Sequence, residues 1–172
     1  MFISLLNQKP TRYTTEDKVM ASKSEADLKF MRLAEDISSE SDDPEYPNRA
    51  EAGVGCVIVV NNEVVVGAAN RLPPKLREAN FLEKKEIGEK YFFVEHAERT
   101  AILQAMSNGI NLNGGTLYCT RFPCSDCARA ILFADIKRVV VSPGISSEGH
   151  WQKSQRAALE MLRKSGVVVR YL

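Results

Sequence analysis

The sequence predicts an α/β sandwich built on one mixed β-sheet. Two β-branched runs, residues 54–60 and 64–69, are joined by Asn61-Asn62. Because asparagine tolerates the positive φ angles of a two-residue hairpin turn, these runs predict an antiparallel hairpin. Beyond it, strand-like runs alternate with helical segments, which indicates parallel strands with helices packed on the sheet. The chain of 172 residues has the length of one domain, which we expect over residues 23–172.

Local patterns predict the elements in chain order. Residues 1–22 show no clean period and are expected to form an N-terminal arm. Ser24 with Asp27 resembles a capping box, which starts a helix that continues to about Ser38. Breaker residues predict a loop over 39–51. An insertion-like charged loop, in which partial helix stays open, follows the hairpin over 71–94. We expect further helices at 95–107, 124–134 and 151–165, and strands at 116–120, 138–142 and 167–171.

Composition and charge exclude several classes of protein. Hydrophobic residues make up 44% of the chain and charged residues 26%, which disfavours a disordered, collagen-like or coiled-coil protein. The 23 Lys and Arg residues offset 22 Asp and Glu residues, so no overall field attracts a polynucleotide, although a local basic patch stays open. The apolar run 57–60 is far below the roughly 18 residues of a membrane-spanning helix. With no secretory leader recognised at the start, we expect a cytoplasmic protein without membrane contact.

Four cysteines and two histidines carry the metal-binding pattern. In a reducing compartment, cysteines serve metals, catalysis or burial rather than disulfides. Cys124 and Cys127 lie three residues apart at a predicted helix start, where the helix dipole favours thiolate. His96 opens another predicted helix, and together the three side chains suit zinc with its fourth position left for water. Cys56 and Cys119 are expected in the core.

Glu98 is the candidate proton carrier. A zinc-bound water loses its proton far more readily than bulk water. Glu98, two residues after His96, is placed to take that proton and deliver it to a leaving group. The Cys-x-x-Cys alone also fits a redox pair, two buried thiols or half of a structural zinc site, but a closed structural site needs a fourth protein ligand.

These residues resemble the cytidine and deoxycytidylate deaminase superfamily, whose signature is His-x-Glu followed by Pro-Cys-x-x-Cys. The likeness covers roughly residues 53–141 and includes His96-Ala97-Glu98-Arg99 and Phe122-Pro123-Cys124-Ser125-Asp126-Cys127. It implies a three-layer α/β/α sandwich of cytidine-deaminase type, with a mixed five-stranded sheet and helices on both faces. The ligand histidine resembles the deoxycytidylate, tRNA-adenosine and guanine branches, and the short gap between the cysteines argues against riboflavin-pathway deaminases. Residues 122–131 look most like the deoxycytidylate (dCMP) deaminases.

The resemblance also implies an enzyme and roles for its residues. The reaction would be zinc-dependent hydrolytic deamination of a cytosine nucleotide, of the dCMP to dUMP type, by zinc-bound hydroxide with Glu98 as proton shuttle. One zinc ion (Zn2+) per chain is expected. The N–H of Ala97 would bind the base carbonyl, the carbonyl of Pro123 would contact the departing amine, and Asn70 would bind the sugar hydroxyl unless it is only a turn residue. A homo-oligomer is expected on the same ground.

Two more binding residues are hypotheses. Arg71 stands where deoxycytidylate deaminases commonly have glycine, and with Lys75 or Arg77 it is expected to bind a 5′-phosphate. Phe122 either stacks on the pyrimidine or fills the core. Rival functions stay open at this point: a cytidine, guanine or tRNA-adenosine deaminase with the same zinc chemistry, or a zinc-stabilised binding module that catalyses nothing.

Overall fold

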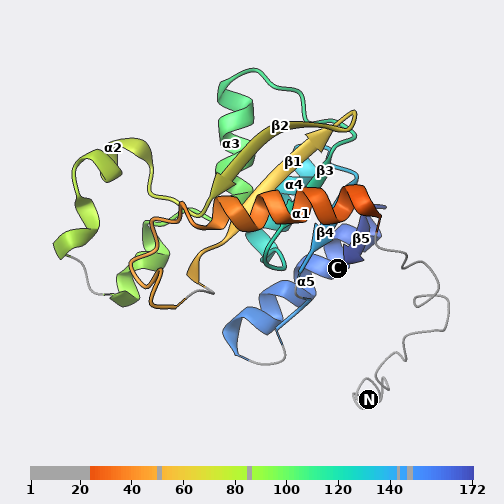
Figure 1. Cartoon of the computed structure of the whole chain (residues 1–172). Coiled ribbons are helices and arrows are strands. Elements are labelled where there is room, and N and C mark those ends of the chain that lie inside the picture. The colour runs from red at the N-terminus through yellow and green to blue at the C-terminus, as the bar shows by residue number, and fades with distance from the viewer. Residues whose placement is uncertain (1–23, 50–51, 85–86, 143, 147–148) are drawn as a thin grey trace, which may run out of the picture.

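A mixed five-stranded sheet in the order β2-β1-β3-β4-β5 forms the centre of the computed structural model (Figure 1). The structure describes residues 24–49, 52–84, 87–142, 144–146 and 149–172, so the predicted arm over residues 1–22 lies outside the described residues. The strands are β1 (Gly55–Val60), β2 (Glu63–Ala69), β3 (Thr116–Cys119), β4 (Arg138–Val141) and β5 (Val168–Tyr171). β1 is antiparallel to β2 and to β3, whereas β3, β4 and β5 run parallel. The predicted mixed sheet is therefore confirmed.

The β1–β2 hairpin turns at the predicted residues. Asn61 and Asn62 have φ angles of 52° and 66°, the left-handed values that this kind of turn requires. The two strands pair from Gly55 with Ala69 to Val60 with Glu63, with one irregularity between Ile58 and Val59. The hairpin thus brings Asn70, which follows β2, to the same edge as the start of β1.

Helices cover both faces of the sheet, which confirms the three-layer sandwich. The helix α1 (Glu25–Ser38) packs on one face (Figure 1). The helices α3 (Ala97–Ser107), α4 (Ser125–Phe133) and α5 (His150–Lys164) contribute to the core on the other face. Side chains of each strand alternate between these two cores, as the pleat of a strand dictates: Val57 and Val59 face α1, while Cys56 and Ile58 face the other helices.

Close packing of α1 on β1 depends on a glycine. A Cβ atom on Gly55 would lie 1.8 Å from the carbonyl oxygen of Ala34 in α1, so no other residue fits at this position without moving the helix. The fully buried Cys56 and Cys119 face each other across β1 and β3 as free thiols, so their predicted place in the core is confirmed.

The segment that follows the hairpin is partly helical, which is the alternative that the sequence left open. It contains α2 (Pro74–Glu78) and two short 3-10 helices, η3 (Phe81–Lys84) and η4 (Ile87–Phe92). The next helix begins at Ala97 rather than at the predicted residue 95. Glu95 stays extended because its N–H donates to the carbonyl of Arg71 and its carbonyl accepts the N–H of Arg71. Among the described residues, no helix has the length and apolar character needed to cross a membrane.

Candidate active site

The starts of α3 and α4 bring together three potential metal ligands. His96 is the N-cap of α3 and Cys124 is the N-cap of α4, with Cys127 in the first turn of the same helix. The His96 Nδ1 atom lies 3.6 Å from Cys124 Sγ and 3.4 Å from Cys127 Sγ, and the two sulfurs are 3.5 Å apart. In the part of the chain that the structure describes, this is the cluster whose ligand atoms are close enough to share one ion.

These distances fit a tetrahedral zinc ion. Zinc lies about 2.3 Å from thiolate sulfur and about 2.0 Å from imidazole nitrogen, so the ligand atoms of a tetrahedral site are about 3.5–3.8 Å apart. The separations of 3.4–3.6 Å in the structure match that range to within a few tenths of an ångström. One imidazole and two sulfurs also form a donor set that zinc prefers, and they leave one of its four positions open.

The two sulfurs differ in acidity. The hydrogen bond with Cys127 and that with His96 outweigh burial and lower the pKa of Cys124 to about 4. The Cys127 backbone N–H also points at Cys124 Sγ, at 3.5 Å, as expected for an N-cap acceptor. The bond with Cys124 and burial raise the pKa of Cys127. The environment of Cys124 therefore favours the thiolate form, which is the form that binds metals.

Glu98 lies beside this group in the first turn of α3. Only 3% of its surface is exposed, yet it lines the same cavity as His96 and Cys124. Burial raises the pKa of Glu98, and its carboxyl group interacts with His96, Cys124 and Cys127. A carboxyl with a raised pKa in a cleft is suited to exchanging protons near neutral pH.

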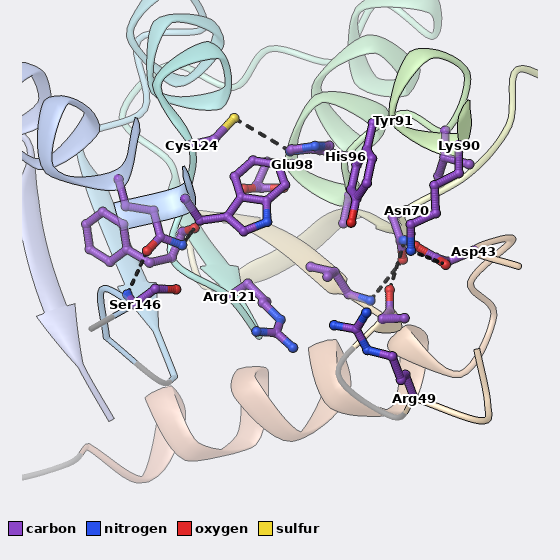
Figure 2. A pocket seen from close by; sticks show the side chains of 17 residues that line it. Asp43, Arg49, Asn70, Lys90, Tyr91, His96, Glu98, Arg121, Cys124 and Ser146 are labelled. Carbon is purple, nitrogen blue, oxygen red and sulfur yellow. Dashed lines mark hydrogen bonds and ion pairs between the residues drawn. The ribbon is translucent and has the colours of Figure 1, made fainter. Parts of the chain in front are cut away.

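A cavity of about 190 Å³ extends from the metal ligands to a basic end. Arg49, Lys90 and Arg121 supply the positive charge among its lining residues. Figure 2 shows Arg49 and Arg121 on the side of the cavity that lies away from Cys124. The cavity is thus polarised, with His96, Glu98 and Cys124 at one end and guanidinium groups at the other.

Lys90 fixes one wall of the cavity. Its Nζ donates to Asp43 Oδ1 at 2.8 Å and also pairs with Glu45, which in turn binds Arg49 at 2.8 Å. Burial by itself would lower the pKa of Lys90, but its hydrogen bonds to Asp43 and Glu45 outweigh that effect and raise it. The buried ion pairs hold the loop that carries Arg49 against the residues around Tyr91.

Aromatic rings line the cavity next to the metal ligands. Trp151 of α5 contacts the His96 ring, with centroids 5.6 Å apart and an interplanar angle of 60°. Tyr91 meets Trp151 edge to face at 6.2 Å. All three residues line the cavity, so a planar ligand that enters it meets aromatic surface beside the ligand histidine.

The structure brings most of the sequence-predicted residues to this cavity. Asn70, Ala97 and Phe122 line it, together with His96, Glu98 and Cys124. The Asn70 side chain accepts the N–H of Val54 at 2.9 Å and donates to the carbonyl of Ala52 at 3.0 Å. Pro123 is fully buried between the lining residues Phe122 and Cys124. Phe122 belongs to the core, where it stacks on Tyr171 at 6.0 Å, and also borders the cavity.

Arg71 is not brought to the cavity. Its guanidinium pairs with Glu40, and its backbone pairs with Glu95, so the side chain is directed to the loop after α1. Arg77 pairs with Asp42 at 3.1 Å. Arg49 and Arg121 occupy the basic end instead.

Sequence reasoning missed these cavity residues for different reasons. Arg121 comes directly before Phe122 and the metal cysteines, so its place in the chain was a usable signal. Arg49 reaches the cavity from a loop far away in sequence, and only the tertiary fold reveals it. Trp151 and Gln155 on α5 also line the cavity, and no sequence pattern had assigned either of them to it.

Comparison with known proteins identifies the class of this chain, which is a hydrolytic deaminase. A family model described as the "Cytidine and deoxycytidylate deaminase zinc-binding region" matches residues 24–143. The chain belongs to this family of cytidine and deoxycytidylate deaminases. His96, Cys124 and Cys127 lie within the matched residues, as do Glu98 and Asn70.

Individual relatives agree with this assignment. An uncharacterised deaminase in the luxG 3′ region of Aliivibrio fischeri is 30% identical over 145 residues, which cover 84% of this chain and 91% of the relative. The deoxycytidylate deaminase of Mus musculus is 29% identical over 149 residues, which cover 82% of this chain and 76% of the relative. The crystal structure of dCMP deaminase from the cyanophage S-TIM5 in complex with dCMP and dUMP has a TM-score of 0.64 at 23% identity, covering 88% of this chain and 100% of that one. That last likeness establishes a shared fold.

Proposed function

We propose that this chain deaminates a cytosine nucleotide, with dCMP as substrate and dUMP and ammonia as products. The polarity of the cavity carries the proposal, because His96, Glu98 and Cys124 lie at one end and Arg49 and Arg121 at the other (Figure 2). A cytosine nucleotide has the matching polarity, with its reactive amine at one end and its phosphate at the other.

His96, Cys124 and Cys127 are proposed to hold one zinc ion per chain. Their mutual distances and donor types support this assignment. When bound, zinc lowers the pKa of a water in its open position, so that a nucleophile is available near neutral pH.

Glu98 is proposed to move the protons of the reaction. Its carboxylate takes one proton from the attacking water and gives it to N3 of the base, which makes C4 more electrophilic. It then carries the second proton of that water to the exocyclic nitrogen, the C4–N bond breaks, and ammonia leaves. The base gains one oxygen and becomes uracil, while the carboxylate returns to its first state. Burial raises the pKa of Glu98, which supports a carboxyl that exchanges protons near neutral pH.

Backbone and amide groups are proposed to orient the base and sugar. Ala97 is the first residue of α3, where N–H groups have no partner inside the helix, and its N–H would donate to the base carbonyl. The carbonyl of Pro123 would accept a hydrogen bond from the departing amine. Asn70 uses one acceptor site and one donor of its amide for the backbone, and a second site of each kind is left for a sugar hydroxyl.

Arg121 and Arg49 are proposed to bind the 5′-phosphate. Both guanidinium groups border the cavity at the end away from the metal ligands (Figure 2). Arginine suits this role because its planar group makes paired, charge-assisted hydrogen bonds with phosphate oxygens. This assignment moves the phosphate contact from Arg71 to two residues that line the cavity.

A panel of substrates tests the proposed function. Ammonia release from zinc-loaded protein is measured with dCMP, CMP, deoxycytidine, cytidine, cytosine, guanine and a tRNA that carries the target adenosine. We expect the highest kcat/KM with dCMP. A preference for guanine or tRNA would contradict the proposed substrate. A folded, zinc-loaded protein that releases no ammonia from any of them would point to a binding module.

We also propose that copies of this chain associate with one another, as the resemblance to the superfamily implies. Light scattering coupled to size-exclusion chromatography gives the mass directly. A mass equal to that of one 19.2 kDa chain at all concentrations would contradict the proposal.

A further inference from the structure

The segment that carries Cys124 is held at both ends by one helix. This segment, residues 122–125, links β3 to α4. Two successive residues of α5, Ser154 and Gln155, make hydrogen bonds to this segment, although about 30 residues of chain separate α5 from it. Their neighbour Trp151 contacts the His96 ring, so α5 touches both ligand-bearing segments.

Ser154 binds the residue that follows Cys124. Its Oγ accepts the backbone N–H of Ser125 at 2.9 Å and lies 3.0 Å from Ser125 Oγ. The first N–H groups of a helix have no acceptor within it, and a cap side chain satisfies only one or two of them. In α4 the cap is Cys124, whose sulfur accepts the N–H of Cys127. Ser154 therefore supplies from another helix an acceptor that the cap sulfur does not provide.

Gln155 binds the residue that lies two positions before Cys124. Its Nε2 donates to the carbonyl of Phe122 at 3.2 Å, and its Oε1 accepts the N–H of Ser146 at 2.7 Å, the bond drawn at Ser146 in Figure 2. The side chain is buried, so both bonds are made out of contact with bulk water. Gln155 thus fixes the backbone just ahead of the metal ligand.

We propose that Ser154 and Gln155 are positioning residues for the zinc site. They act through the backbone on either side of Cys124 and hold its Sγ at the distance from His96 Nδ1 that one ion can bridge. Residues that orient metal ligands in this way typically change metal affinity by about 10–100-fold when they are replaced. The inference rests on the proposed function in one respect, which is that Cys124 is a zinc ligand.

The test compares zinc affinity in variants that differ by one hydroxyl. Ser154→Thr keeps the hydroxyl, whereas Ser154→Val places a side chain of nearly the same shape as threonine there without a hydroxyl. The zinc dissociation constant of each folded protein is measured by competition with a chromophoric chelator. We expect Ser154→Val and Ser154→Ala to bind zinc roughly 10-fold or more weakly and Ser154→Thr to stay close to wild type. Gln155→Met, which loses both bonds, is expected to weaken binding by a similar factor.

Two controls separate positioning from general stability. Lys153→Ala changes the exposed neighbour in α5 and is expected to leave zinc affinity unchanged. Urea unfolding of each metal-free variant shows whether lost affinity merely follows lost stability. Ser154→Val and Ser154→Thr with equal zinc affinities would overturn the role of Ser154. A Gln155→Met protein that binds zinc with wild-type affinity would overturn the positioning role of Gln155. If Gln155→Met does not fold, Gln155→Leu takes its place in this comparison.

The same measurements distinguish this inference from the proposed function. A wild-type protein that binds no zinc would defeat both. A wild-type protein that binds zinc but deaminates nothing would end the proposed function, while the Ser154 comparison would still decide the positioning role. Affinity that is unchanged in active variants would defeat the positioning role alone.

Discussion

His96 Nδ1 lies 3.4 Å from Cys127 Sγ, although 31 positions separate the two residues in the chain. One belongs to the start of α3 and the other to the first turn of α4. An ion bound between them would therefore add a link between the starts of two helices that already contact each other. Metal binding should contribute to stability as well as to catalysis, because the ligand group exists only in the folded chain.

Removal of zinc is expected to abolish activity and lower the melting temperature. A ligand present at 100 times its dissociation constant stabilises the folded state by about 2.7 kcal/mol, which corresponds to roughly 5–10 °C for a chain of this size. Chelation followed by differential scanning calorimetry and an ammonia assay measures both effects. Readdition of zinc should restore both, whereas magnesium should restore neither. A melting temperature indifferent to zinc would contradict the site.

Replacement of Glu98 by glutamine should remove proton transfer while keeping the shape of the side chain. We expect kcat for dCMP to fall by roughly 10²–10⁴-fold, the usual contribution of a general acid–base group. Zinc content, measured by atomic absorption, should stay at one ion per chain, because Glu98 is not among the ligand atoms. Activity within a few-fold of wild type in a zinc-loaded Glu98→Gln protein would refute the assigned role.

The phosphate contact is tested by comparing two arginines. Arg121→Ala should raise KM for dCMP by roughly 10–100-fold, since charge-assisted hydrogen bonds contribute about 1.5–3 kcal/mol. Its effect on deoxycytidine, which has no phosphate, should be small. Arg71→Ala should leave KM for dCMP near wild type, because its guanidinium pairs with Glu40 outside the cavity. A raised KM for dCMP in Arg71→Ala together with an unchanged KM in Arg121→Ala would restore the sequence-based hypothesis for Arg71.

The contrast between these arginines shows what the sequence could predict. The hairpin turn and the ligand spacing follow from local chemistry: positive φ at Asn61 and Asn62, and cysteines that share the first turn of a helix. Whether an arginine in a loop faces a cavity depends on tertiary pairing. Arg71 follows the hairpin closely in sequence, yet Glu40 draws its side chain away from the cavity.

The tertiary contacts of α5 were also beyond what local sequence patterns could predict. Its apolar spacing predicted a helix that packs on the sheet, and this is confirmed. The hydrogen bonds of Ser154 and Gln155 to the Cys124 segment depend on how α5 lies against α4, and no short-range pattern contains that information. Polar residues on the buried side of a predicted helix are the signal to examine in such cases.

A buried carboxylate on the opposite face of the sheet gives the chain a specific acid sensitivity. Asp27 in the first turn of α1 accepts the hydroxyl of Tyr118 at 2.8 Å and pairs with Arg138 at 2.5 Å. The side chain of Asp27 is only 8% exposed. The hydrogen bonds from Arg138, against the opposing effect of burial, lower the pKa of Asp27 from 3.8 to about 2.

This lowered pKa sets the direction of the pH effect. The unfolded chain binds a proton at Asp27 more readily than the folded chain, so the stabilisation is fully present above about pH 4 and is lost as the pH falls towards 2. A shift of this size corresponds to about 2 kcal/mol. Asp27→Asn should therefore be less stable than wild type at pH 7 by at least about that amount, and the difference should narrow by about 2 kcal/mol as the pH falls from about 4 to about 2. Urea unfolding at a series of pH values measures this difference in the free energy of unfolding. Glu25→Gln is the control, because it changes an exposed carboxylate in the same helical turn. A difference between wild type and Asp27→Asn that stays constant over this range would show that the ion pair does not couple folding to pH.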